Sequence, residues 1–194
     1  LKHAVRFSTV ALVGLFILYS VQFLAVISFL PTLLVEQSDL ALTTAAFFSG
    51  IVAIGNAVGA VLAGPLIKLG VRRRDIIIAG YVLMALFAAI VLLDLFPVPV
   101  RIAAAIGFST SGALVPGTIW TFVPELAERP AQAPIFAGML IQGSGIGQIT
   151  GPVLLGGLVD AFGRWDAAVL LTTGASLLGI VLALSSQRRA SQPQ

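Results

Sequence analysis

Residues 7–35 read FSTVALVGLFILYSVQFLAVISFLPTLLV, a run of 29 residues without a charged side chain. A helix that crosses a membrane needs about 20 consecutive apolar residues. Five further charge-free runs follow, at residues 40–67, 76–93, 102–124, 130–159 and 167–187, with lengths of 28, 18, 23, 30 and 21 residues. Backbone groups in lipid must bond within their own segment, and no run alternates as a β-barrel strand does. The six runs therefore predict six transmembrane helices.

The composition of the whole chain supports the same class. Of 194 residues, 58% are hydrophobic and 10% are charged, and the mean hydropathy is +1.06. A soluble domain carries about 25% charged residues, so a soluble enzyme, a nucleic-acid binder and a disordered chain are excluded. The sequence has no cysteine and a single histidine, His3, at its N-terminal end. We therefore predict no catalytic residue, no metal site and no cofactor.

Basic residues divide unevenly between the two ends of the predicted helices. We define side A as the end that carries the N-terminus and side B as the opposite end. Side B holds Arg101 and Arg164, whereas nine basic residues fall on side A: Lys2, Arg6, Lys68, Arg72, Arg73, Arg74, Arg129, Arg188 and Arg189. Basic residues gather in cytoplasmic loops of membrane proteins. We expect both termini in the cytoplasm and an integral multi-pass protein of a bacterial inner membrane, and the net charge of +3 reflects this topology.

The domain organisation follows from the short connections between the runs. We predict one domain, residues 1–194, a six-helix bundle with spans near 10–35, 41–67, 76–93, 102–124, 133–159 and 167–187. A motif of glycine, an amide residue and two further glycines begins at Gly55 and recurs 92 residues later at Gly147. Residues 29–33 and 122–126 match at an offset of 93. Repeats of three spans have opposite topology, so the predicted fold is all-α with two inverted three-helix repeats.

Several motifs together resemble one transporter family. Residues 147–157 read GQITGPVLLGG, residues 156–165 read GGLVDAFGRW, and residues 64–74 read GPLIKLGVRRR. These stretches resemble the major facilitator superfamily, specifically its C-terminal six-helix half, helices 7–12. In the last stretch Lys68 stands where that family carries an acid, and Gly70 comes one position early. Residues 124–130, PELAERP, with residues 142–144, are similar to a cyanate-permease-like bacterial branch.

The resemblance implies secondary-active transport of a small-molecule substrate by alternating access. This chain would be the C-terminal half, and its partners would be the lipid bilayer and a missing N-terminal six-helix half. In the family, helices 7 and 10 line the central cavity and helices 8 and 11 flank it. The polar side chains on the corresponding runs are the expected substrate-binding residues: Gln22, Asn56, Ser111, Trp120, Gln142 and Gln148. The alternative for each is hydrogen bonding between helices, worth about 0.6–2 kcal/mol.

Glycines recur every fourth residue along the fifth run. Gly143, Gly147 and Gly151 share one helix face, and Pro152 follows. Small residues allow helices to approach closely in lipid, and a proline removes one helix hydrogen bond. We interpret this row as gating and packing residues, with plain packing as the alternative. By the same helical spacing, Ser144 and Gln148 share a face whereas Gln142 points elsewhere.

Two features of the sequence bear on coupling and on alternative functions. No ionisable residue lies deep within a charge-free run, so a proton relay or a counter-charge for a charged substrate would come from the other half. An intramembrane enzyme is excluded because no serine–histidine pair or paired acids lie mid-span. The remaining alternatives are a self-standing six-span homo-oligomeric channel or half-size transporter, or an inactive fragment, since the sequence begins with Leu1.

Overall fold

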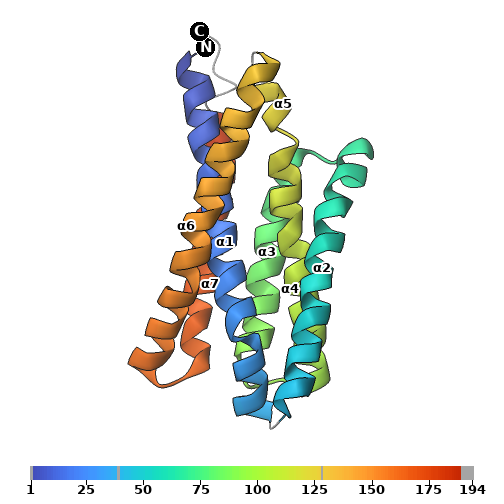
Figure 1. Ribbon diagram of the computed structural model, residues 1–194, viewed down its shortest axis with the longest axis vertical. Helices are drawn as coiled ribbons and strands as arrows, with labels where there is room; N and C mark the ends of the chain where they lie inside the picture. The colour runs from blue at the N-terminus through green and yellow to red at the C-terminus, as the bar shows by residue number, and fades with distance from the viewer. Residues whose placement is uncertain (1, 39, 128, 189–194) are drawn as a thin grey trace.

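The computed structural model describes residues 2–38, 40–127 and 129–188, which form an all-helical bundle (Figure 1). Six helices are long: α1 (Lys2–Ser38), α2 (Leu42–Lys68), α3 (Arg73–Leu92), α4 (Val98–Trp120), α6 (Ala133–Phe162) and α7 (Ala168–Arg188). Three short elements lie in the connections: α5 (Val123–Leu126), η1 (Pro130–Gln132) and η2 (Trp165–Ala167). Within the described residues, six helices are long and apolar enough to cross a membrane. The all-helical fold with six membrane-length helices is thereby confirmed.

The ends of the helices separate into the two sides defined above. The N-terminal end of α1, the α2–α3 turn, α5 and the C-terminal end of α7 lie at one end of the bundle, which is side A (Figure 1). The α1–α2, α3–α4 and α6–α7 connections lie at the other end, which is side B. The identification of side A with the cytoplasm stays a prediction.

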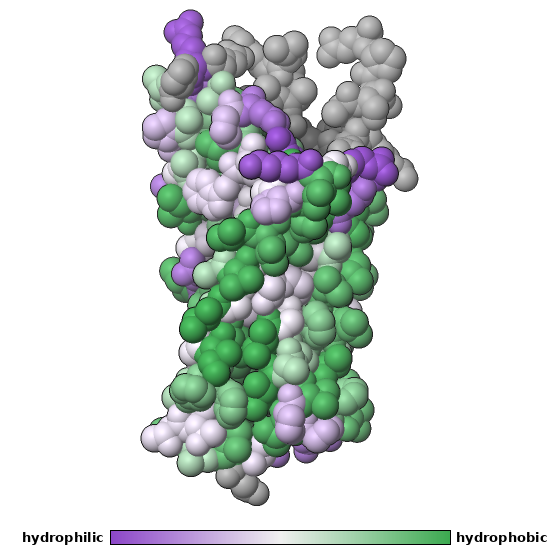
Figure 2. Space-filling model, turned by 90° about the vertical axis from the view of Figure 1, so that its right-hand side faces the viewer, coloured by the Kyte–Doolittle hydropathy of each residue, from purple (hydrophilic) through white to green (hydrophobic). Residues whose placement is uncertain are grey.

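One face of the bundle is largely apolar at mid-height. Figure 2 shows hydrophobic residues over most of the middle of one face, with hydrophilic residues gathered toward one end. Val61 of α2 and Ile149 of α6 are each 74% exposed. Exposed aliphatic side chains in a continuous band suit contact with lipid tails or with another apolar helix rather than with water.

Glycines bring α6 into backbone contact with α1. A Cβ atom added at Gly147 would lie 2.6 Å from the carbonyl oxygen of Ile17, and one at Gly143 would lie 2.7 Å from Val13 Cγ1. A Cβ at Gly151 would meet the carbonyl oxygen of Val21. The glycine row therefore rests directly on α1, which no larger residue would allow. Its part in gating stays a prediction.

The other glycine motif packs α2 against α4 in the same manner. A Cβ at Gly55 would lie 2.9 Å from Thr110 Oγ1, and one at Gly59 would meet the Thr110 carbonyl oxygen. From the opposite helix, a Cβ at Gly117 would lie 2.5 Å from the carbonyl oxygen of Ala60. Each copy of the glycine motif thus contacts a helix of the other three-helix set. The inverted relation between the two sets stays a prediction.

Positive-φ glycines shape two of the turns. Gly70, between α2 and α3, has a φ of 88°, and Gly163, after α6, has a φ of 66°. Gly163 donates its backbone N–H to the Val159 carbonyl at 2.8 Å and so caps the end of α6. Residues with a Cβ rarely adopt this conformation, which explains why both turns carry glycine.

Candidate functional site

Polar residues from all six long helices meet near half the height of the bundle. Each lies close to the midpoint of its helix. Each either makes a hydrogen bond to another helix or bonds to a residue that makes one. We define this group as the polar layer: Tyr19, Ser20, Gln22, Asn56, Tyr81, Ser109, Ser144, Gln148 and Ser176. Burying a polar group in an apolar bundle costs free energy unless the group is hydrogen-bonded. The polar layer is therefore the level at which the bundle accommodates polar side chains.

One part of the polar layer joins α1, α2 and α4. The half-buried Asn56 donates from Nδ2 to the hydroxyl of Tyr19 at 2.8 Å and to the Ser109 carbonyl at 3.4 Å. The Ser109 side chain is fully buried, and its hydroxyl has no hydrogen-bond partner among the described residues. This cluster therefore holds an amide whose oxygen is available for a further bond, beside a hydroxyl that has bonding capacity left.

A second part of the polar layer joins α1 and α6. The hydroxyls of Ser20 and Ser144 lie 3.0 Å apart, and Gln148 donates from Nε2 to Ser144 Oγ at 3.0 Å. Ser144 and Gln148 share one helix face, as their four-residue spacing predicts. Gln148 is exposed whereas Ser20 and Ser144 are buried. The hydrogen bonds thus lead from the interior of the bundle to its surface.

The two clusters share one turn of α1. Tyr19 bonds toward α2 and the next residue, Ser20, bonds toward α6. Consecutive residues on a helix point about 100° apart. Two neighbouring residues of α1 can therefore form hydrogen bonds to α2 and to α6 at the same height. The long helices differ in the buried share of their most apolar 18-residue stretch. This share is 22% in α2 and 17% in α6, against 39% to 56% in the other four helices. The clusters therefore end at the two helices that the bundle covers least.

A row of aromatic rings continues from the polar layer along α1 and α4. The rings of Tyr19 and Phe23 stack with centroids 5.4 Å apart, and Phe23 stacks on Phe108 at 6.4 Å. In the other direction the centroid of the Phe16 ring lies 6.0 Å from that of Tyr19 and 6.2 Å from that of Trp120, with which it makes a T-shaped pair. Trp120 lies at the C-terminal end of α4 and is 38% exposed. The row gives the α1–α4 interface flat apolar surfaces beside the Tyr19 hydroxyl.

Gln22 of α1 is bonded to a third neighbouring helix, α7. Ser176 of α7 donates to Gln22 Oε1 at 3.0 Å, and the Gln22 side chain is fully buried, with no hydrogen-bond partner for Nε2 among the described residues. Nearby, the Tyr81 hydroxyl of α3 donates to the Leu15 carbonyl at 2.5 Å. These bonds hold α7 and α3 to α1. The geometry of Gln22 matches the interhelical alternative, and its contact with a substrate stays a prediction.

The remaining predicted substrate residues are dispersed. Ser111 is buried on α4, donates to the Gly107 carbonyl of its own helix at 2.6 Å and lies beside Gly80 of α3. Gln142 is exposed on α6. Of the predicted residues, Asn56, Gln148 and Gln22 therefore belong to the polar layer, whereas Ser111, Gln142 and Trp120 lie outside it.

Sequence reasoning missed several residues that make defined contacts. Tyr19, Ser20, Tyr81 and Ser176 belong to the polar layer, and the position of both tyrosines within charge-free runs is a signal that could have identified those two. Arg101 was missed as well. The charge pattern assigns it to a side-B connection, whereas it lies in the first turn of α4 with 1% exposure. Helix α4 begins at Val98, four residues before the charge-free run that starts at residue 102. Arg101, which precedes that run, therefore belongs to the helix and not to the connection.

The side-A end of the bundle carries an ion pair between α3 and α5. Arg73 Nη2 lies 2.6 Å from Glu125 Oε1, and its Nη1 donates to Oε2 at 2.7 Å. The guanidinium also lies 4.7 Å from the centroid of the Phe122 ring. The described residues contain no group of three or more His, Cys, Asp or Glu that could hold a metal ion.

A family model described as Major Facilitator Superfamily matches residues 15–194. No curated protein matches the chain.

Proposed function

This chain belongs to the Major Facilitator Superfamily, a family of transporters rather than enzymes, and we propose that it moves a small solute across a membrane by alternating access. In this proposal the chain is the C-terminal half of the transporter, and a second six-helix bundle supplies the other half. Side A faces the cytoplasm of a bacterial cell, in keeping with the distribution of basic residues.

One observation carries this proposal: the polar layer reaches the surface at the two least covered helices. Asn56 lies on α2 and Gln148 on α6, and only 22% and 17% of the apolar windows of these helices are buried. Amide side chains facing lipid tails are costly. A second bundle with a hydrated cavity between the two halves would cover these faces at less cost. Transporter sites also lie near the bilayer midplane, and the residues of the polar layer lie near the midpoints of the long helices.

The chemistry of this surface suggests the class of substrate. The polar layer offers amides and hydroxyls, and none of its members is an acid or a base at neutral pH. Near the layer, the ring of Trp120, which is 38% exposed and contacts Phe16, presents aromatic surface. This half would bind a small hydrogen-bonding solute through Asn56 and Gln148. A net charge on the solute, or a coupled proton, would be balanced by residues of the other half.

Uptake into cells that express the chain together with an N-terminal six-helix bundle tests the proposal. A panel of labelled small polar solutes identifies the transported one. We expect Asn56→Ala and Gln148→Ala each to lower the uptake kcat/KM by about tenfold, the effect of losing roughly 1.4 kcal/mol of hydrogen bonding. Matched controls are Ser49→Ala on α2 and Thr150→Ala on α6, because both hydroxyls donate to carbonyls of their own helix.

The outcomes separate the parts of the proposal. Unchanged uptake in the Asn56→Ala, Gln148→Ala double variant would refute the assigned site while leaving transport intact. Failure of any solute to accumulate in the presence of both halves would refute transport by this chain. Uptake by the chain expressed alone would favour the self-standing homo-oligomer, in which a second copy covers α2 and α6.

A further inference from the structure

The buried Arg101 joins three helix ends on side B. Its guanidinium donates to the Val91 carbonyl of α3, from Nε at 3.0 Å and from Nη2 at 2.8 Å. Its Nη1 donates to Ser38 Oγ at the end of α1 and to Asp94 Oδ1 in the α3–α4 connection, both at 3.4 Å. Nη2 also donates to Gln37 Oε1. A single planar group thus connects the ends of α1, α3 and α4.

The charge of Arg101 explains why these ends gather around it. A guanidinium stays protonated in proteins, and a buried charge is costly unless it is compensated. Asp94 is a weak partner, since its side chain is 67% exposed and lies 3.4 Å away. Helices α1 and α3 both end at this point, and a helix C-terminus carries roughly half a negative charge. Displacing the end of α1 would therefore remove part of the compensation of Arg101.

The bonds of Arg101 divide into a local set and a long-range set. Val91 is 10 residues away in the sequence, in the α3–α4 hairpin to which Arg101 itself belongs. Ser38 and Gln37 are 63 and 64 residues away, on a different helix. The local bonds persist whenever the hairpin is folded. The long-range bonds form only when the end of α1 lies against that hairpin.

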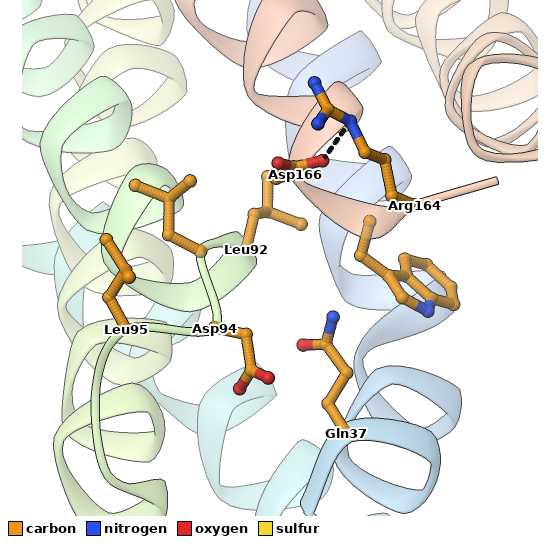
Figure 3. A pocket seen from close by; sticks show the side chains of 8 residues that line it. Gln37, Leu92, Asp94, Leu95, Arg164 and Asp166 are labelled. Carbon is orange, nitrogen blue, oxygen red and sulfur yellow. Dashed lines mark ion pairs between the residues drawn. The ribbon is translucent and has the colours of Figure 1, made fainter. Parts of the chain in front are cut away.

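A cavity adjoins the end of α1 beside this cluster. Its volume is about 370 Å³, and Gln37 and Asp94 line it together with Arg164, Trp165 and Asp166 of the α6–α7 connection (Figure 3). Figure 3 shows the Arg164–Asp166 ion pair across the open space from Gln37 and Asp94. The last turn of α1 therefore has open volume beside it, which a displaced helix end could occupy.

We propose that Arg101 is a latch that holds the side-B end of α1 against α3 and α4. Release of Gln37 and Ser38 frees the last turns of α1 to move toward the cavity, while the bonds to Val91 keep Arg101 in place. The latch is a property of the bundle itself. It rests on the proposed function only in the statement that this motion opens and closes side B of a transport path.

Thiol labelling of the chain in membranes tests the latch directly. The natural sequence contains no cysteine, so one introduced reporter gives a signal without background. Leu34→Cys places a reporter at a position near the end of α1 that is 1% exposed, and Leu155→Cys gives a matched reporter at a fully buried position of α6. Labelling by a maleimide then measures how often each position opens.

Removal of the long-range bonds should release the α1 reporter alone. In the Gln37→Ala, Ser38→Ala variant we expect labelling of the Leu34→Cys reporter to rise about tenfold, equivalent to roughly 1.4 kcal/mol. Labelling of the Leu155→Cys reporter should stay within about twofold. Arg101→Lys, which keeps the charge but lacks the planar fork, should give the same rise. The two changes combined should exceed neither one alone, because they break the same bonds.

Each other result overturns the proposal. An equal rise at both reporters would mean that Arg101 and its partners support the whole bundle. No rise at either reporter would mean that the bonds of Arg101 to Gln37 and Ser38 do not hold the α1 end. The test does not depend on Arg101→Lys folding, because the Gln37→Ala, Ser38→Ala variant leaves Arg101 on Val91. Labelling is independent of uptake. A selective rise at the α1 reporter with unchanged uptake would confirm the latch and refute its role in transport.

Discussion

Replacing Gly147 by alanine tests the contact between α1 and α6 most sharply. The new methyl group would lie 2.6 Å from the Ile17 carbonyl oxygen and 2.7 Å from Ser20 Cβ, where ordinary contacts begin at 3.4 Å. The two helices must separate by about 0.8 Å to relieve the shorter contact. Forced overpacking of this kind costs about 1–3 kcal/mol. The same shift would lengthen the 3.0 Å bond between Ser20 and Ser144.

Gly145→Ala is the matched control on the same helix, because a Cβ at Gly145 has no neighbour within 4 Å. Both substitutions gain helix propensity, about 1 kcal/mol each, so this term cancels in the comparison. We expect Gly147→Ala to be less stable than Gly145→Ala by about 1–3 kcal/mol in reversible unfolding of the purified protein in detergent mixtures. Equal stability of the two variants would refute the backbone contact between α1 and α6.

Three further predictions concern hydrogen bonds and an ion pair. Tyr81→Phe removes a buried hydroxyl that donates to a backbone carbonyl at 2.5 Å, and should lower unfolding stability by about 1 kcal/mol; an unchanged midpoint would contradict this bond. In a double-mutant cycle of unfolding free energies, Arg73→Gln and Glu125→Gln should show a coupling energy of about 0.2–1 kcal/mol. Because both side chains are partly exposed, this coupling energy should decrease in 1 M salt. A salt-independent coupling energy would argue against an ion pair. Trp165→Phe keeps an aromatic ring but removes the 2.9 Å bond from Nε1 to Glu36, so it and Glu36→Ala should each cost about 0.5–1.5 kcal/mol and should not be additive.

The fold class could be predicted because membranes impose a simple rule on sequence. Lipid excludes charge, so six charge-free runs were sufficient to predict six helices. Helix ends were harder to place. Arg101 flanks a charge-free run, and its position inside α4 depends on the helix ends of α1 and α3 that compensate its charge. The α1 partners, Ser38 and Gln37, lie 63 and 64 residues away in the sequence, and no local pattern reveals them.

The candidate site could be predicted only in part, for a related reason. Residue type and run identify which polar side chains lie in the membrane, and the four-residue spacing identified the shared face of Ser144 and Gln148. Spacing does not say which neighbour a helix face meets. Gln22 and Asn56 are both mid-run amides, yet one bonds toward α7 and the other toward α1 and α4. That difference arises from the packing order of six helices.

The close pairing of α1 with α6 has a consequence for how the protein is made. The Ser20–Ser144 bond spans 124 residues, and ribosomes add about 5–20 residues per second. Synthesis of the α1 contact residues therefore precedes that of their α6 partners by roughly 6–25 s. During that interval the Ser20 hydroxyl and the exposed backbone carbonyls of Ile17 and Val21 have no α6 to cover them. The face of α1 that packs on Gly143, Gly147 and Gly151 therefore acquires its cover only after α6, the fifth long helix of this chain, has been synthesised.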